Sequence, residues 1–409
     1  MTTGRLPPGA TGAPGAYVHV PFCAHRCTYC SFIALEGRSE ENEYFSALER
    51  EIGTYSQQYP VLSPFDSVYF GGGTPSYVEA ARLGHVLSTL AEIFGLSSDV
   101  EITAEANPDD LGSERLSGLL ALGINRLSIG VQSLVDAELV PLERRHDAAA
   151  ARRAVSEAVR AFGNVSADLM IGIPGQTKET LLASVDGLLE AGVTHLSAYL
   201  LEIDKAPKLV ALKKEQPALF ASDDEMADRW EAVDERLTAA GLPRYELSNW
   251  ARPGFESRHN LKYWTLTPVL GFGVGAHSFD GRKRYANTGM LAEYLRRLRE
   301  GVSPVVTSEE DQEDLLRRNE GLTSDLRVSS EGFTFVDLLR RKEGLMLGLR
   351  LSSGVPSSTF EEIRKSLSSD SAARMEDAFL AGLLEERSGR VRLTRRGVLL
   401  SNEVFSLLV

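Results

Sequence analysis

The stretch Tyr17-Val-His-Val-Pro-Phe-Cys-Ala-His-Arg-Cys-Thr-Tyr-Cys30 contains every cysteine of the 409-residue chain. Cys23, Cys27 and Cys30 form a C-x3-C-x2-C loop directly after an apolar run that is typical of a β-strand. Three thiolates from one loop can bind three irons of a 4Fe-4S cluster and leave the fourth iron open to an outside ligand. The amino and carboxylate groups of an amino acid can chelate that iron. Because the chain has no fourth cysteine, a closed cluster with four Cys ligands is excluded.

A zinc site is the alternative for these cysteines, with His25 or a distant residue as the fourth ligand. The spacing favours the iron-sulfur cluster but leaves zinc open. An odd number of cysteines, all close together in the chain, fits a reducing compartment better than a disulfide framework. We expect a cytoplasmic protein, because residues 1–16 lack the apolar run of a signal peptide and no later stretch approaches roughly 18 uninterrupted apolar residues.

The composition, 43% hydrophobic and 25% charged, is sufficient for a large core with smaller appended domains. The formal net charge of −13 disfavours nucleic acid as the main partner. A cluster of arginines lies near the C-terminus. It could contact DNA if this part of the chain formed the wing of a winged-helix domain, but a solvent-exposed face of a hairpin explains the cluster more simply. Its members are Arg387, Arg390, Arg392, Arg395 and Arg396.

Runs rich in β-forming residues alternate with helical patterns from residue 17 to about 203, which predicts repeated βα units and a parallel sheet. Tyr44, Leu48, Ile52 and Tyr55 share one face of the first helix. We therefore predict an α/β fold with a partial (β/α)6 TIM-type barrel. The six expected strands are Tyr17–Phe22, Ser67–Phe70, Val100–Ala106, Arg126–Gln132, Ser166–Ile173 and His195–Ile203.

The rest of the chain predicts further domains. After residue 205 the alternation stops, and a helical stretch leads into a region dense in Asn, His, Tyr and Trp, which we interpret as substrate-side. The segment from residue 339 to the C-terminus predicts a helix, a hairpin and a closing helix, as in a winged-helix fold. The expected division is 1–16 as a flexible tail, 17–205 as the barrel core, 206–305 as an appended α+β region, 306–338 as a connection or insertion, and 339–409 as a winged-helix-like domain.

Polar and glycine-rich motifs follow the predicted strands at their C-terminal ends, where parallel barrels collect their active sites. The cysteine loop follows the first strand. Gly71, Gly72 and Gly73 follow the second and would let the backbone approach a ligand, although a tight turn would use the same residues. Glu105 and Gln132 close the third and fourth strands.

Five strings together resemble the coproporphyrinogen III oxidase-like branch of the radical S-adenosylmethionine (SAM) superfamily. They are Tyr17–Cys23, Gly71–Pro75, Glu105–Pro108, Ser128–Ser133 and Asp168–Thr177. The resemblance implies a 4Fe-4S cluster on the three cysteines. Tyr29 and Phe32 flank the last ligands and would serve as apolar cover for the cluster, with ordinary loop packing as the alternative. The resemblance also implies a SAM site formed by Tyr17, Gly72, Gly73, Thr74, Glu105, Gln132, Arg144 and Asp168.

Two departures separate the chain from the oxygen-independent coproporphyrinogen III oxidases of this branch. The cysteine motif of those enzymes is C-x3-C-x2-C-x-C, whereas Phe32 occupies the position of the last cysteine here. They also have a sizeable N-terminal extension, whereas only the short segment 1–16 precedes the first strand here. We therefore do not expect decarboxylase activity, and whether SAM is cleaved stays open.

The stretch Arg258–Trp264 matches the H-N-x-x-Y-W string of haem chaperones in the same branch. The resemblance implies haem binding through His259, Asn260, Tyr263 and Trp264, with His259 as the iron ligand beside aromatic faces. A hydrogen-bonded core histidine is the alternative for His259.

Our leading hypothesis is a haem chaperone that carries a 4Fe-4S cluster with SAM and passes haem to apo-haemoproteins. An oxygen-independent coproporphyrinogen III oxidase is the main alternative, followed by a radical methyltransferase and a DNA-binding module. Transient membrane association and a homodimer are left open.

Overall fold

A computed structural model describes residues 12–58, 62–308, 335–367 and 369–408. Its largest sheet has eleven strands in the order β13-β12-β11-β10-β1-β4-β5-β6-β7-β8-β9. The six central strands are all parallel, which confirms the predicted (β/α)6 core. These strands are β1 Gly15–Val20, β4 Phe65–Gly72, β5 Leu96–Ala106, β6 Arg126–Gln132, β7 Val165–Ile171 and β8 His195–Leu200.

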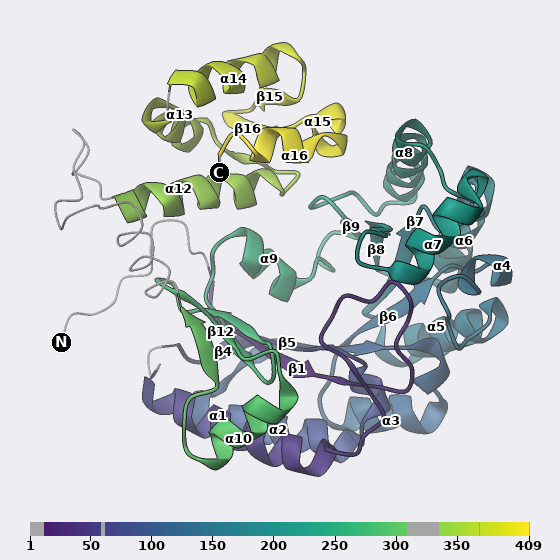
Figure 1. Ribbon diagram of the computed structural model, residues 1–409, viewed down its shortest axis with the longest axis vertical. Helices are drawn as coiled ribbons and strands as arrows, with labels where there is room; N and C mark the ends of the chain where they lie inside the picture. Colours follow the sequence, from purple (N-terminus) through teal and green to yellow (C-terminus); the bar gives the residue numbers. More distant parts are fainter. Residues whose placement is uncertain (1–11, 59–61, 309–334, 368, 409) are drawn as a thin grey trace.

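Helices between these strands cover the convex face of the curved sheet (Figure 1). Capping residues fix the ends of these helices. At the start of α5, the Asp147 side chain accepts a hydrogen bond from the Ala150 backbone N–H. The residue after α5 is Gly163, whose backbone lies in the left-handed region. Thr177 forms a capping box at the start of α6. The helices are α1 Glu41–Gln58, α2 Ala80–Phe94, α3 Ser113–Ala121, α4 Asp136–Leu139, α5 Ala148–Phe162 and α6 Lys178–Ala191, with 3-10 turns η1 Pro75–Tyr77 and η2 Pro108–Asp110.

The region after residue 205 extends the same sheet at both edges instead of standing beside it. β10 pairs in parallel with β1, and β9 pairs antiparallel with β8. Its strands are β9 Asn249–Ala251, β10 Val269–Phe272, β11 His277–Phe279, β12 Arg284–Asn287 and β13 Val305–Ser308. Its helices are α7 Pro207–Glu215, η3 Pro217–Leu219, α8 Asp223–Ala239, α9 Arg258–Trp264 and α10 Leu291–Arg299.

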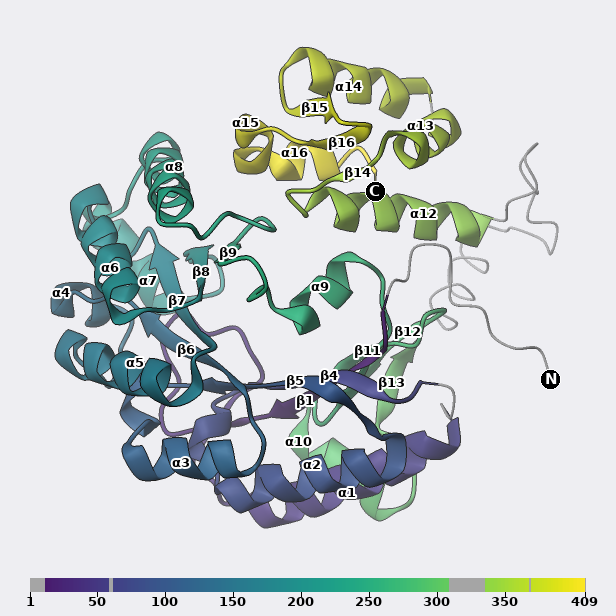
Figure 2. The ribbon, with the colours of Figure 1, turned by 180° about the vertical axis from the view of Figure 1, so that it is seen from behind.

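Helix α9 lies on the concave side of the sheet, opposite the covering helices, as Figure 2 shows from behind. The Ser257 side chain caps it by accepting from the Asn260 backbone. Glu101 of β5 accepts from the first backbone N–H groups of the helix, those of Arg258 and His259, at 3.1 and 3.0 Å. Charge-assisted bonds of this kind satisfy donors that a helix start leaves open.

The C-terminal part forms a separate helical layer with a three-stranded sheet in the order β14-β16-β15. A tight turn with positive φ at Ser388 and Gly389 joins β15 to β16, as in two-residue hairpins. The elements are α12 Phe335–Leu349, β14 Val355–Pro356, α13 Ser357–Ser366, α14 Ser369–Leu380, β15 Leu384–Arg387, β16 Arg390–Leu393, α15 Arg395–Leu399 and α16 Ser401–Phe405.

Four arginines of the C-terminal cluster contact the protein itself. Arg392 pairs with Glu385 at 2.6 Å, and Arg395 pairs with Glu235 of α8 at 2.8 Å. Arg390 and Arg396 donate to backbone carbonyls. These contacts give the four arginines roles within the fold. The predicted tail and connection fall mostly on residues 1–11 and 309–334, which lie outside the described residues.

Candidate functional site

The inner face of the barrel is polar, because alternate residues of each strand point in opposite directions. In β6, Leu127 and Ile129 are fully buried in the hydrophobic core, whereas Arg126, Ser128 and Gln132 line a cavity on the inner face. The same period of two places polar residues on the inner face of β7 and β8. The interior is therefore chemically suited to a polar or charged ligand.

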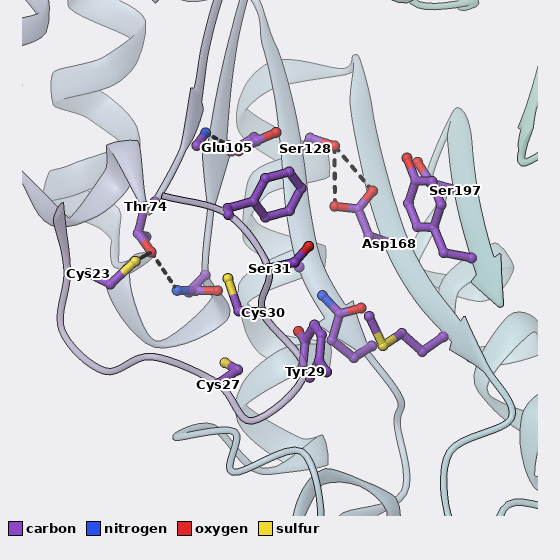
Figure 3. Close-up of a pocket in the computed structure, with 18 of the residues that line it drawn as sticks. Cys23, Cys27, Tyr29, Cys30, Ser31, Thr74, Glu105, Ser128, Asp168 and Ser197 are labelled. Carbon is purple, nitrogen blue, oxygen red and sulfur yellow. Dashed lines mark hydrogen bonds between the residues drawn. The ribbon is translucent and has the colours of Figure 1, made fainter. Parts of the chain in front are cut away.

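This cavity encloses about 460 Å³, which lies within the usual range for small-molecule sites. The three cysteines lie along one side of it, and carboxylates and hydroxyls from β5 to β8 lie across from them (Figure 3). The predicted residues that line it are Cys23, Cys27, Tyr29, Cys30, Phe32, Gly72, Gly73, Thr74, Glu105, Gln132, Arg144, Asp168 and Asn260.

The cysteine loop is held at both ends and in the middle. Cys23 ends β2 (Phe22–Cys23), which pairs in parallel with β3 (Leu35–Glu36) on the far side of the loop. The Thr28 hydroxyl donates to the Pro141 carbonyl at 3.0 Å. The Cys30 backbone donates to the Cys27 carbonyl at 3.2 Å. The ligand loop is thus tied to the barrel by contacts of the protein itself.

His19 connects the first strand to the end of the loop. Its ring nitrogens contact the Tyr17 hydroxyl at 3.0 Å and the Ile33 carbonyl at 2.8 Å. Burial lowers the pKa of His19. Gly72 has φ +110, and a Cβ there would lie 2.4 Å from the His19 ring. Tyr17, predicted as a SAM contact, is not among the cavity-lining residues and instead supports this histidine.

Two of the thiols receive hydrogen bonds from cavity residues. The Thr74 hydroxyl donates to Cys23 Sγ and Arg144 Nη1 donates to Cys27 Sγ, both at 3.3 Å. Burial raises the pKa of Cys23 to about 11 and also raises that of Cys30. Cluster ligands are thiolates, so these protons must leave when iron binds, and the two donors would then stabilise the anions.

The donor set fits an iron-sulfur cluster. Among the described residues, no three His, Cys, Asp or Glu side chains are arranged to hold a single metal ion. The loop presents its thiols from separate positions along the cavity wall (Figure 3). Soft thiolate ligands of this kind suit iron-sulfur clusters.

Arg144 is fixed beside the loop by several acceptors. Its Nη2 donates to Asn107 Oδ1 at 2.6 Å and to the Gly130 carbonyl at 2.5 Å, while Nη1 also contacts the Tyr29 hydroxyl at 3.3 Å. Both Nη groups therefore already have two acceptors each, and Nε is buried without a partner. Pairing with a carboxylate in the cavity would replace some of these contacts.

Two carboxylates face the cavity from neighbouring strands. Glu105 accepts from the Tyr69 hydroxyl at 2.9 Å and from the Gly72 backbone at 3.0 Å. Burial raises the pKa of Glu105 to about 7, and the nearby Asp168 also raises it. Asp168 accepts from Ser128 at 3.2 Å, and burial likewise raises its pKa. Both carboxylates would ionise more readily beside a cationic ligand.

Gln132 has a left-handed backbone with φ +66, although it is not glycine. The register between β6 and β7 shifts between Gly130 and Gln132. This irregularity aims the Gln132 side chain at the cavity, and such strain is often found at ligand sites.

Helix α9 brings the predicted haem string to the inner face, but its members have different surroundings. His259 is 1% exposed, with Nδ1 at 3.0 Å from the Ser67 hydroxyl and Nε2 at 3.0 Å from the Tyr263 hydroxyl. Its ring stacks on Tyr69 at 5.1 Å. Asn260, not His259, lines the cavity.

Trp264 lies at the contact with the C-terminal part. The Arg350 guanidinium, which follows α12, is 4.6 Å from the Trp264 ring centre and 5.6 Å from that of Phe405. Tyr263 and Trp264, like Tyr17 and His259, do not line the cavity.

The motif search missed several residues that line the cavity: Tyr69, Arg126, Ser128, His195, Ser197 and Tyr199. None was predicted as a ligand contact, but all occupy inward positions of β4, β6 and β8. The alternation of polar and apolar residues within these strands was the signal that could have identified them.

Comparisons with known proteins match this arrangement. The family model of the radical SAM superfamily matches residues 17–188, and that of the HemN C-terminal domain matches residues 340–400. A curated relative from Mycobacterium tuberculosis, named heme chaperone HemW, is 34% identical over 98% of this chain and 97% of its own. The chain belongs to the HemW family of radical SAM proteins. A HemW from Bacillus subtilis is 33% identical over 95% of this chain and 97% of its own.

The fold has a counterpart among solved structures outside the HemW family. The structure described as coproporphyrinogen III oxidase (HemN) from Escherichia coli, a radical SAM enzyme, aligns with a TM-score of 0.76 at 23% identity. The alignment covers 97% of this chain and 90% of that one. For the residues that the structure describes, no helix has the length and apolar character needed to cross a membrane.

Proposed function

We propose that the protein is a haem chaperone, which binds haem together with a 4Fe-4S cluster and SAM and delivers the haem to apo-haemoproteins in the cytoplasm. The observation that carries the proposal is that Asn260, from the Arg258–Trp264 string, lines the same cavity as the three cysteines. The two motifs lie far apart in the chain, yet one residue of the second faces the space that the cysteines line.

Cys23, Cys27 and Cys30 would hold the cluster, which when bound can supply one electron to a SAM molecule on its open iron. Arg144 would pair with the SAM carboxylate, since its guanidinium is already oriented by Asn107 and Gly130. Glu105 would accept from the SAM ammonium group. Gln132 and Asp168 would bind hydroxyl or amino groups.

The mouth of the cavity supports the haem side of the proposal. Phe32 is 64% exposed, Leu200 50% and Tyr199 41%, and all three line the cavity. Large exposed apolar side chains around a concave site are typical of ligand-binding surfaces. A flat macrocycle could stack on the two rings. Phe32 stands where the oxidases of this branch have a further cysteine.

His259 remains the proposed iron ligand. Ser67 would keep the ring oriented through Nδ1, as supporting residues do for histidine ligands. Burial lowers the pKa of His259 to about 3, so the imidazole is neutral, as metal binding requires. Nε2 is held by the Tyr263 hydroxyl, so iron binding would replace that hydrogen bond.

The test is a haem titration of anaerobically reconstituted protein, with His259→Ala and the exposed His85→Ala as a matched control. We expect saturable binding of haem by the native protein and His85→Ala, and a changed Soret spectrum in His259→Ala. An unchanged spectrum and stoichiometry in His259→Ala would remove His259 as the ligand.

The same reconstituted sample, given SAM and coproporphyrinogen III, distinguishes a chaperone from an oxidase. We expect no protoporphyrinogen. Its formation with repeated turnover would contradict the chaperone proposal and support the oxidase alternative.

A further inference from the structure

Arg126, the first residue of β6, is a buried cation without a protein partner among the described residues. Its side chain is among the largest fully buried ones, with 1% exposure, and it lines the cavity. Nε has no hydrogen-bond partner. In the part of the chain that the structure describes, the guanidinium forms no ion pair or hydrogen bond with another residue.

Nε is enclosed without an acceptor, which is costly for a buried polar group. The two Nη groups have no protein acceptor within the described ranges of the chain, and the side chain lines the cavity, so their hydrogen bonds are available to a ligand. Buried polar groups almost always have partners, so an exception inside a cavity points to a missing ligand. Its donors form a fixed planar fork that matches a carboxylate.

The nearest anions on the protein are already occupied. The charge of Arg126 lowers the pKa of Glu105 and of Asp168, although burial has the larger, opposite effect on both. Arg126 forms no hydrogen bond with either carboxylate. Glu105 is bonded to Tyr69 and Gly72, and Asp168 to Ser128. A SAM ammonium at Glu105 would leave the charge of Arg126 still less compensated.

Arg126 also differs from Arg144, a half-buried arginine of the same cavity. Arg144 has four acceptors beside the cysteine loop and belongs to the proposed SAM site. Arg126 lies at the opposite end of β6 from Gln132, toward α9, and its charge affects His259. Asn260 of α9 lines the same cavity. The position of Arg126 therefore suits a second ligand, not the carboxylate of SAM.

We propose that Arg126 forms a carboxylate subsite for the second ligand of the cavity, and that it binds a propionate arm of the tetrapyrrole. This inference rests on the proposed function, which supplies a ligand with carboxylate arms. The guanidinium already faces the cavity, so the charge is in place before the ligand arrives.

The test compares haemin with haemin dimethyl ester, whose arms carry no charge, on reconstituted full-length protein with SAM present. We expect the native protein to bind haemin about 10- to 100-fold more tightly than the ester, as a charge-assisted bond predicts. In Arg126→Gln the affinity for haemin should fall by a similar factor, while that for the ester stays unchanged. Arg236→Gln, at an exposed pair with Asp186, is the control and should behave as native.

A second variant serves in case Arg126→Gln does not fold. Asn260→Asp adds a carboxylate at the cavity wall and should weaken haemin more than the ester. Equal affinity of the native protein for the two compounds, or preserved discrimination in Arg126→Gln, would overturn the subsite alone. Failure of both compounds to bind would contradict the proposed function as well. A lower affinity of Arg126→Gln for SAM, with haemin unaffected, would assign Arg126 to SAM instead.

Discussion

The two ends of the inner face both contain polar side chains but differ in how many of their hydrogen bonds the protein itself supplies. At the N-terminal ends of the strands, two Ser–His–Tyr chains are joined by hydrogen bonds between their own side chains. Ser67, His259 and Tyr263 form one, and Ser166, His195 and Tyr245 form the other at 2.7 and 2.9 Å. At the C-terminal ends, thiols and carboxylates face an open cavity. The histidines at the N-terminal ends are thus bonded to other side chains, so a ligand there, such as iron at His259, must replace one of these hydrogen bonds. The groups at the C-terminal ends, and Arg126 at the start of β6, face the cavity directly.

The largest expected effect concerns the C-terminal end. Cys30→Ser should abolish stoichiometric cluster binding, because two thiolates cannot hold a cubane whose fourth iron must stay open. Iron and acid-labile sulfide are measured after anaerobic reconstitution. Ser31→Ala, at the next position of the loop, should retain both. Full iron and sulfide in Cys30→Ser would show that this end is not a cluster site.

At the N-terminal end we expect a loss of stability instead. His195→Ala leaves Ser166 and Tyr245 without their shared partner and should lower the free energy of unfolding by about 3 kcal/mol. Denaturant unfolding measures the change. His195→Gln should lose less, and cluster content should stay unchanged in both variants. A stability equal to native would mean that the Ser–His–Tyr chains contribute little.

A third test concerns recognition of SAM. Arg144→Lys keeps the charge but cannot form the fork that contacts Asn107 and Gly130. We expect SAM affinity to fall about tenfold or more, measured by equilibrium dialysis. Arg145→Lys, which changes a half-exposed neighbour paired with Asp109, is the control. Similar losses in both variants would argue against a specific role for Arg144.

The pH dependence of SAM binding should follow Glu105. Its pKa is about 7, so the carboxylate is charged above that value and protonated below it. SAM affinity should therefore fall as the pH drops below 7, by at most about tenfold per unit. In Glu105→Gln the affinity should be lower and nearly independent of pH. A native profile that is flat from about pH 6 to about 8 would exclude this role.

The smallest effect is expected far from either end. Arg387→Gln on the C-terminal hairpin should change stability by no more than about 0.5 kcal/mol and leave haem and SAM binding unchanged. Thermal unfolding and the titrations above measure this. A clear loss of haem binding would extend the functional surface to the hairpin.

The barrel could be predicted from the sequence because its signals are local. The predicted strand Arg126–Gln132 coincides with β6, and the helix with Tyr44 and Leu48 on one face is α1. The cysteines and the residues near strand ends converge on one cavity as expected. Contacts between distant segments could not be predicted. Ser67 and His259 are 192 residues apart, and no local pattern shows that a short helix will place them together.

Two further differences have causes that motif matching hides. Tyr17 and His19 are alternate residues of one strand, so they share a face and bond to each other, a contact that the motif alone does not show. The pairing of β10 with β1 joins the first strand of the core to one that follows all six core strands in the chain. The apolar run of β10 is compatible with many positions in the sheet, so its partner cannot be read from sequence.

The absence of a side chain at Gly72 has a consequence for protein engineering. The His19 ring occupies the space where any other residue would place its first carbon, and the same ring holds the end of the cysteine loop. The cysteine loop and the glycine turn therefore have to be replaced together. A chimera that takes the first strand and the loop from a relative should also take residues 65–74. Otherwise the side chain at position 19 will not fit against the glycine turn.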